Sequence, residues 1–152
     1  MSASQKQNQI VLAAREWIGT PYRHQASMRG VGTDCLGLIR GVFAQVEGHA
    51  PEIPPPYSQD WAEAPGLSGV VEETMADAAR RHLVAIEREK AAPGDVLLFR
   101  MSPRAAAKHA AIQSTATCMI HACSGRAVAE VHMGPWWQRR LTHVFRFPGI
   151  EV

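Results

Sequence analysis

The chain has 152 residues, of which 46% are hydrophobic and 20% charged, and its net charge is +2. This length allows one ordinary domain with a sizeable core, and the composition is that of a globular protein. With no run of Lys or Arg and no long apolar stretch, the sequence does not indicate a nucleic-acid-binding or membrane-spanning protein. We therefore expect one domain over residues 1–152, with neither nucleic acid nor membrane as a partner.

The first third of the sequence predicts two helices. Residues 9–18 carry apolar side chains at helical spacing. A second helix is predicted to begin at Cys35 and to end near Gly48, with Thr33 or Asp34 as its cap. Its apolar stripe indicates packing against a core.

The rest of the chain changes from helix to strand signals. The proline-rich residues 51–56 must be extended, and residues 68–90, rich in strong helix formers, predict a third helix. After a turn signal, A-P-G-D at 92–95, come five predicted strands: V-L-L-F-R, H-A-A-I-Q, C-M-I-H-A, A-V-A-E-V-H and T-H-V-F-R-F. Helices followed by an antiparallel sheet indicate an α+β domain.

Cys35 lies in the first turn of the predicted second helix. Unpaired backbone N–H groups and the positive end of the helix dipole favour a thiolate there, so Cys35 is a candidate nucleophile. The alternative is a small apolar residue facing the core, which is the commoner role of a lone cysteine. A nearby base would decide between the two.

Two histidines in neighbouring predicted strands could supply that base. If the hairpin is centred on Thr115, His109 and His121 are directly opposed, with Cβ atoms roughly 5 Å apart. One imidazole could then orient the other, as the base and its orienting partner do in a catalytic triad. For the other histidines we expect ordinary hydrogen-bonded or exposed positions.

A zinc site formed by Cys118, His121 and Cys123 is the competing interpretation of this region. In a strand, Cys118 faces opposite to His121 and Cys123, so the three cannot converge on one ion without distortion. The odd number of cysteines, three, also argues against a disulfide framework and predicts at least one free thiol. We expect no metal.

Five short motifs occur along the chain: G-T-P-Y at 19–22, T-D-C-L-G-L at 33–38, P-G-D-V-L-L-F at 93–99, K-H-A-A-I at 108–112 and M-I-H-A at 119–122. In this order they resemble the motifs of the NlpC-type cell-wall cysteine peptidases, which are papain-like enzymes that cleave the stem peptides of peptidoglycan. The resemblance spans roughly residues 9–147.

The resemblance implies a papain-like fold in which N-terminal helices pack against a C-terminal antiparallel sheet of about five strands, with the nucleophile at a helix N-terminus. Carried over by position, Cys35 is the nucleophile, His109 the general base and then acid, and His121 the group that orients His109. Tyr22 and Asp34 match positions that line the pocket beside the cysteine and bind substrate. No metal or organic cofactor is implied.

Two features depart from the family pattern. Leu36 follows the cysteine where serine is usual, and residues 23–25 replace a glycine pair. The segment Y-R-H-Q-A-S at 22–27 resembles that of the subgroup of this family found in phage tails and gene-transfer particles. That subgroup implies tail hub or baseplate partners. The N-terminal residues lack a secretion signal, so we expect synthesis in the cytoplasm and action on the cell wall from a virion-like particle.

The sequence therefore predicts a peptidoglycan cysteine endopeptidase that cleaves between D-glutamate and the diamino acid of the stem peptide. Two alternatives remain open at this point. One is a structural tail-tip or baseplate subunit with the same fold and little activity. The other is an amidase or acyltransferase, because an activated thiol attacks any acyl carbon.

Overall fold

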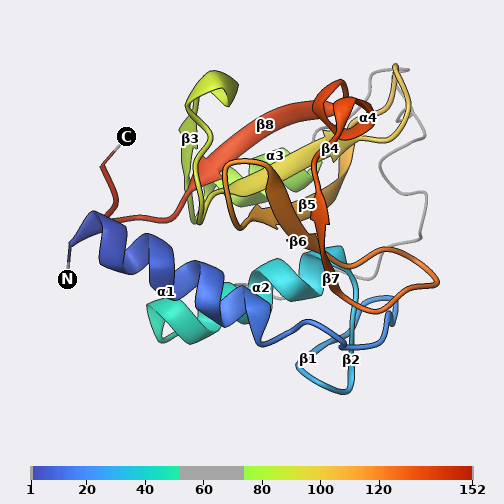
Figure 1. Ribbon diagram of the computed structural model, residues 1–152, viewed down its shortest axis with the longest axis horizontal. Coiled ribbons are helices and arrows are strands. Elements are labelled where there is room, and N and C mark those ends of the chain that lie inside the picture. The colour runs from blue at the N-terminus through green and yellow to red at the C-terminus, as the bar shows by residue number, and fades with distance from the viewer. Residues whose placement is uncertain (1, 52–73, 152) are drawn as a thin grey trace.

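The computed structural model describes residues 2–51 and 74–151. Helices α1 and α2 lie side by side and cover one face of a six-stranded antiparallel sheet (Figure 1). The elements in chain order are α1 (Ala3–Arg15), β1 (Ser27–Met28), β2 (Gly32–Thr33), α2 (Cys35–Glu47), α3 (Thr74–Arg80), β3 (Val84–Ile86), the 3-10 helix η1 (Arg88–Lys90), β4 (Val96–Arg100), β5 (Ala107–Gln113), β6 (Cys118–His121), β7 (Ala129–His132), α4 (Pro135–Gln138) and β8 (Leu141–Arg146). The predicted α+β, papain-like order of helices before sheet is confirmed.

Helix α1 begins and ends earlier than residues 9–18. Ser2 and Gln5 form a reciprocal capping box at its start, in which each side chain accepts from the other residue's backbone N–H. Ile10 and Ala14 are fully buried as expected, but Ile18 is 45% exposed. Ile18 lies beyond the last helical residue, so the helical spacing that placed it on the buried stripe does not apply.

The predicted bounds of α2, from Cys35 to near Gly48, are confirmed. The Asp34 carboxylate accepts from the backbone N–H of Gly37 at 2.7 Å, and Gly48 ends the helix in the left-handed conformation at φ 82°. Gly41 permits close packing against Trp17, which follows α1, because a Cβ at Gly41 would lie 2.1 Å from the Trp17 ring. The start of α2, which carries Cys35, is thus fixed by its cap and by its packing.

The predicted helix over residues 68–90 is wrong in its second half. Helix α3 ends at Arg80, and β3 then pairs with β8, Ala85 lying opposite Phe145. Helix propensity is outweighed here by pairing at the sheet edge, where Val84 and Ile86 suit an extended backbone. Residues 68–73, and all but the first of the proline-rich residues 51–56, lie outside the described residues.

The sheet has the order β3-β8-β4-β5-β6-β7, with one strand more than the five predicted because β3 joins its edge. Ala111 lies opposite His121, so the predicted pairing of His109 with His121 is wrong by two residues. A two-residue shift keeps every side chain on the same face, since strand side chains alternate with period two. His109 therefore stands diagonally from His121, and the two side chains share one face of the sheet, as expected.

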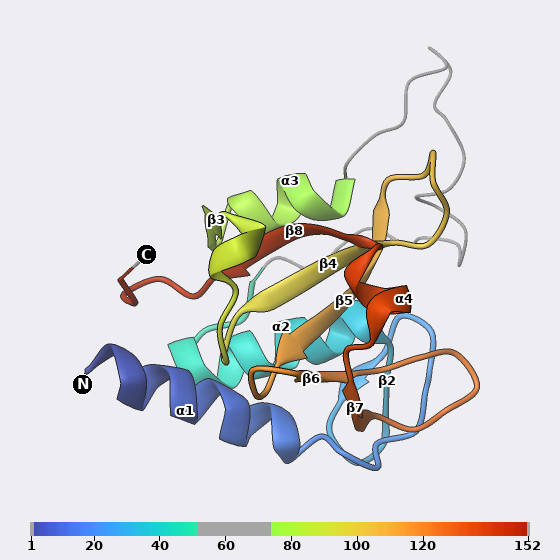
Figure 2. The same ribbon diagram turned by 45° about the horizontal axis from the view of Figure 1, so that its top comes forward.

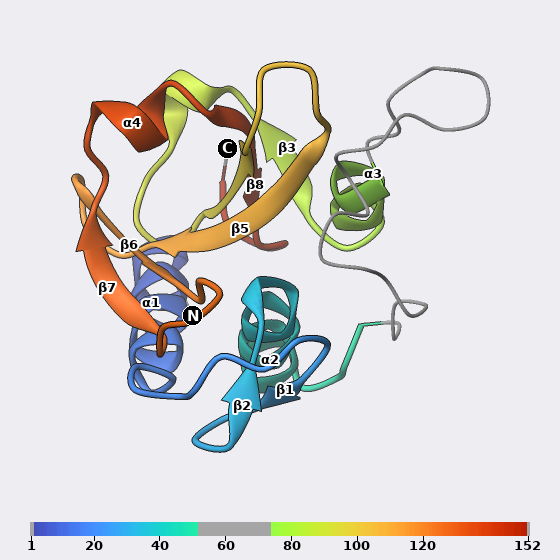
Figure 3. The same ribbon diagram turned by 90° about the vertical axis from the view of Figure 1, so that its right-hand side faces the viewer.

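Both faces of the sheet are covered. Helices α1 and α2 pack on one face, where the main core includes Ile10, Leu38, Val42 and Ile112 (Figure 2). Helix α4 lies against the other, where Leu97, Phe99, Ala111, Met119 and Val144 form a smaller cluster (Figure 3). None of the helices in the described parts of the chain is long and apolar enough to span a membrane.

A buried ion pair connects the turn before β4 to the end of β8. The Arg146 guanidinium donates to both carboxylate oxygens of Asp95, at 2.9 and 2.8 Å, and also to the carbonyl oxygens of Lys90 and Glu151. The second carboxylate oxygen of Asp95 accepts from the backbone of Ala92 at 2.9 Å. Asp95 therefore bonds both within its own turn, to Ala92, and to Arg146 of β8, which lies far away in the sequence.

Replacing Asp95 by Asn should lower the free energy of unfolding by about 3 kcal/mol or more, because it leaves the Arg146 charge buried without its partner. The matched control is Asp77→Asn, which breaks the exposed ion pair with Arg80 and should cost less than about 1 kcal/mol. Urea unfolding measures both. Equal losses in the two variants would contradict a dominant role for the buried pair.

Candidate active site

Cys35 lies where the start of α2 meets β5. Its side chain is partly buried, and its thiol donates to the carbonyl oxygen of Lys108 at 3.7 Å. Lys108 directly precedes His109 in β5. The structure thus brings the predicted nucleophile beside the strand that carries the predicted base.

Burial, together with a smaller effect of the neighbouring Asp34 carboxylate, raises the pKa of the Cys35 thiol to about 12. Backbone hydrogen bonds at Ala110 and Leu36 act in the opposite direction but are weaker. The expectation that the helix start favours a thiolate is therefore wrong for the resting protein, because desolvation exceeds the effect of the helix N-terminus. Cys35 rests as a thiol and needs a base.

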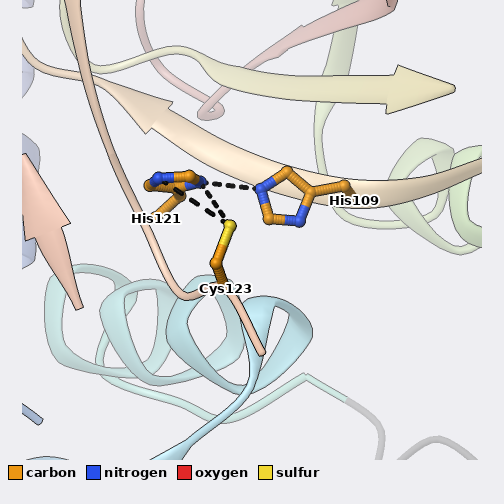
Figure 4. Close-up of side chains that lie close together, drawn as sticks. All are labelled: His109, His121 and Cys123. Carbon is orange, nitrogen blue, oxygen red and sulfur yellow. Dashed lines mark hydrogen bonds between the residues drawn. The ribbon is translucent and has the colours of Figure 1, made fainter. Parts of the chain in front are cut away.

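His109 and His121 form a linked pair of imidazoles, as predicted. Nε2 of His109 and Nδ1 of His121 lie 2.9 Å apart, and each residue is only 7% exposed (Figure 4). The rings are nearly perpendicular, at 84°. A hydrogen bond of this kind fixes the orientation of both rings.

Both imidazoles are neutral at neutral pH. Burial lowers the pKa of His109 to about 3, with further effects from His121 and Lys108. Burial also lowers the pKa of His121 to about 4, with Arg126 adding to the effect. A neutral imidazole can accept a proton, which is what a general base requires.

The hydrogen bond between the histidines sets which nitrogen can act. It occupies Nε2 of His109, so Nδ1 is the nitrogen available to the cysteine, and Nε2–H must then donate to Nδ1 of His121. No hydrogen bond joins Cys35 to His109 within residues 2–51 and 74–151. The thiol must leave the Lys108 carbonyl before it can pass its proton to His109.

Tyr22 and Asp34 both lie close to Cys35. Asp34 is 3% exposed, and its two carboxylate oxygens accept from the backbone of Gly37 and of Gln25, each at 2.7 Å. Tyr22 is partly buried, and burial, Asp34 and Cys35 raise its pKa. Asp34 thus holds the preceding loop onto α2, and the substrate contacts of both residues stay predictions.

Trp137 is a site residue that the sequence did not reveal. Its ring stacks on His109 at 5.2 Å between centroids and meets His121 edge to face at 5.2 Å. It also contacts Phe99 at 5.0 Å. Helix α4, which carries Trp137, has only four residues, too few to show a periodic pattern. Trp137 covers the imidazole pair and contributes to its burial.

Cys123 is the other residue whose contact was missed. Its sulfur lies 3.4 Å from Nδ1 of His121. Strand alternation had placed both residues on one side, with Cys118 on the other, but without assigning Cys123 a role. His109, His121 and Cys123 bring their ligand atoms within 4.8 Å of one another, so these three could hold a metal ion. Cys118 is outside this group. All three cysteines are free thiols, which agrees with the prediction of at least one.

A cysteine at a helix start, beside a strand that carries one of two linked imidazoles, is the arrangement that the papain-like class of cysteine peptidases uses. Comparison with known families agrees with that class. The chain belongs to the NlpC/P60 family, whose model matches residues 19–146.

One similar curated protein is a gamma-DL-glutamyl hydrolase of Bacillus subtilis (strain 168). It is 27% identical to this chain over 144 residues, which make up 94% of the chain and 30% of that protein. The chain thus spans less than a third of its relative's length.

Solved structures with the same fold include the NlpC/P60 domain of the peptidoglycan hydrolase SagA, with a TM-score of 0.62 at 24% identity over 93% of this chain and 98% of that one. An NlpC/P60 family protein from Bacillus cereus ATCC 10987 gives a TM-score of 0.66 at 17% identity, covering 93% and 40% of the two chains. The peptidoglycan hydrolase RipB from Mycobacterium tuberculosis gives 0.61 at 20%, covering 99% and 67%. At these identities the likeness establishes the fold.

The buried histidines should make the protein sensitive to acid. An unfolded imidazole binds a proton below its ordinary pKa of 6.5, whereas folded His109 does so only near 3, so acid favours the unfolded chain. When the pH is lowered from about 7 to about 5, the free energy of unfolding should therefore fall by about 2 kcal/mol less in His109→Gln than in the wild-type protein. Urea unfolding at both pH values measures this, and equal losses would contradict it.

Removing the ring that covers the histidines should raise their pKa. Trp137→Leu admits water to His109, so its pKa should rise by about one unit or more towards the ordinary value. Titration of the imidazole signals by NMR measures the shift. Trp136→Leu is the matched control, since Trp136 is 44% exposed and should leave the His109 pKa unchanged. A pKa that moves in neither variant would mean that Trp137 does not shield the pair.

Proposed function

We propose that this protein hydrolyses peptide bonds in the stem peptides of peptidoglycan, with Cys35 as nucleophile, His109 as general base and His121 as the residue that orients His109. The observation that carries this proposal is the hydrogen bond between the two imidazoles, in the strand pair beside the start of α2. This bond uses Nε2 of His109, so Nδ1 of the same ring stays available to accept the proton of Cys35. The SagA and RipB structures, described as peptidoglycan hydrolases, support the substrate class.

The reaction follows from the tautomers described above. Nδ1 of His109 takes the thiol proton while the sulfur attacks the substrate carbonyl carbon, and the backbone N–H of Cys35 can donate to the resulting oxyanion. His109 then passes the proton to the leaving amine, which leaves a thioester on Cys35. Water, deprotonated by His109, attacks the thioester, and the released thiol recovers its proton.

The bond that we propose lies between D-glutamate and the diamino acid of the stem peptide. Support comes from the Bacillus subtilis relative, which is named a gamma-DL-glutamyl hydrolase. Tyr22 and Asp34, which lie close to Cys35, are the residues proposed to hold the oxyanion side and the free amino end of the substrate. Asp34 would do so while also capping α2.

We further propose that the protein acts as part of a phage-like particle, in contact with a tail hub or baseplate, and reaches the cell wall with that particle. The support is the segment at 22–27, Y-R-H-Q-A-S, which resembles the tail-associated subgroup. In the structure this segment leads into β1 beside Cys35, and Gln25 donates to Asp34. Substitutions in it would therefore affect Asp34, the cap of the helix that carries Cys35.

One observation favours the alternative of a structural subunit with little activity. Cys35 has a raised pKa of about 12, and its thiol bonds to a backbone carbonyl rather than to His109. In that case Cys35 should resist alkylation by iodoacetamide at neutral pH in the folded protein. Rapid alkylation that is lost in His109→Gln would favour the enzyme.

The proposed activity is tested by incubating the purified protein with diaminopimelate-type peptidoglycan and analysing the soluble fragments by mass spectrometry. We expect fragments that begin with the diamino acid, and Cys35→Ala should lower their rate of release by about a thousandfold or more. Cys118→Ser, at a thiol outside the site, is the matched control and should keep full activity. Fragments released equally by Cys35→Ala would overturn the mechanism.

A further inference from the structure

The side chains of His109, His121 and Cys123 lie close together (Figure 4), with their ligand atoms within 4.8 Å of one another. The sulfur of Cys123 lies 3.4 Å from Nδ1 and 4.0 Å from Nε2 of His121. Nε2 of His109 lies 2.9 Å from the same Nδ1. The proposed hydrolysis uses the two histidines but leaves the Cys123 thiol without a function.

We propose that the imidazoles of His109 and His121 and the thiolate of Cys123 bind a soft divalent cation of the Zn²⁺ type, and that the bound cation inhibits hydrolysis. The binding site stands on the geometry alone. The inhibition rests on the proposed function.

Two of the three ligand separations are close to those of a tetrahedral zinc site, and the ligand atoms of the third pair lie within 4.8 Å of each other. Zinc bonds of about 2.0 Å to nitrogen and about 2.3 Å to sulfur place two ligand nitrogens about 3.3 Å apart and a nitrogen and sulfur about 3.6 Å apart. The corresponding separations here are 2.9 and 3.4 Å. To admit the ion, the imidazoles must turn so that the two nitrogens, which now face each other in a hydrogen bond, both face the ion. Three protein ligands leave a fourth position for water, which is typical of an exchangeable rather than a structural zinc.

The surroundings select a soft cation over a hard one. Lys108 acts on His109 and Arg126 acts on His121, each lowering the pKa of the histidine, so the local charge opposes a cation held by charge alone. Mg²⁺ and Ca²⁺ prefer oxygen ligands, and among the described residues this group of ligands includes no carboxylate. Thiolate and imidazole together are ligands that Zn²⁺ prefers.

Binding would change the tautomer of His109. The cation bonds to Nε2 of His109, so the proton that Nε2 carried moves to Nδ1 of the same ring, and Cys123 releases its thiol proton to water. One proton is thus released for each ion bound. With a hydrogen on Nδ1, His109 can no longer accept the proton of Cys35, and the first step of hydrolysis stops.

Cobalt tests the site without reference to activity. Co²⁺ added to the wild-type protein should give visible bands of a tetrahedral site and a near-ultraviolet band from thiolate to cobalt, and excess Zn²⁺ should abolish both. Cys123→Ser should lose the near-ultraviolet band. Cys118→Ser and Cys35→Ala should keep it. Circular dichroism checks that each variant is folded.

Any other result of the cobalt experiment overturns the proposed site. No near-ultraviolet band in the wild-type protein, or an equal band in Cys123→Ser, excludes Cys123 as a ligand. Loss of the band in Cys35→Ala would assign the metal to the proposed nucleophile. Loss in Cys118→Ser would assign it to the far side of β6, where Cys118 pairs with His132.

Inhibition is measured separately, as the ratio of peptidoglycan hydrolysis with and without Zn²⁺ within each variant. The Zn²⁺ concentration that halves activity should rise about tenfold or more in Cys123→Ser and stay unchanged in Cys118→Ser, with Mg²⁺ as the inactive control ion. An unchanged concentration in Cys123→Ser would overturn the inhibitory role. A protein that binds Co²⁺ as described but releases no fragments would refute the proposed hydrolysis and leave the metal site standing.

Discussion

A carboxylate and a guanidinium, both removed from water, hold the strands of this domain in place. Asp95 and Arg146 pair through two hydrogen bonds, and the same two side chains also bind backbone at the start of β4 and around the end of β8. Buried charges are tolerated only when every donor and acceptor is used. The pair therefore fixes β4, and β5, which carries His109, takes its register from β4.

The same low-polarity surroundings act in opposite ways on the two halves of the site. They keep both imidazoles neutral, which leaves His109 ready to accept a proton, and they keep Cys35 protonated, which leaves the sulfur unreactive. Proton transfer inside the site must therefore create an imidazolium and a thiolate together. Those two charges stabilise each other, so the reactive state depends on the thiol turning from Lys108 to His109.

Sequence patterns were sufficient for the parts of the fold whose signals are local. The cap of α2 at Thr33 or Asp34, the end of α2 near Gly48 and the strands β4 and β5 each depend on a few adjacent residues, and all were predicted. The pairing of His121 with Ala111 was not predicted, because hairpin register depends on how the connecting residues close the turn. Strand β3 was missed because its partner β8 lies far away in sequence.

The candidate site divides in the same way. Cys35, His109 and His121 belong to motifs with recognisable spacing, so their proximity could be predicted. Trp137 reaches the histidines from a four-residue helix after β7, and no pattern in the sequence connects it to them. The pKa of Cys35 also escaped prediction, since helix position is local but burial is a property of the whole fold.

The position of β8 has a consequence for the order in which the protein acquires its structure. Strands β4 to β7 pair with their neighbours along the chain and can form a meander as synthesis proceeds, whereas β8 must enter between β3 and β4. Until residues 141–146 emerge from the ribosome, one side of β4 presents unpaired backbone next to apolar side chains. Chaperone binding during translation is thus most needed in the interval between β4 and β8.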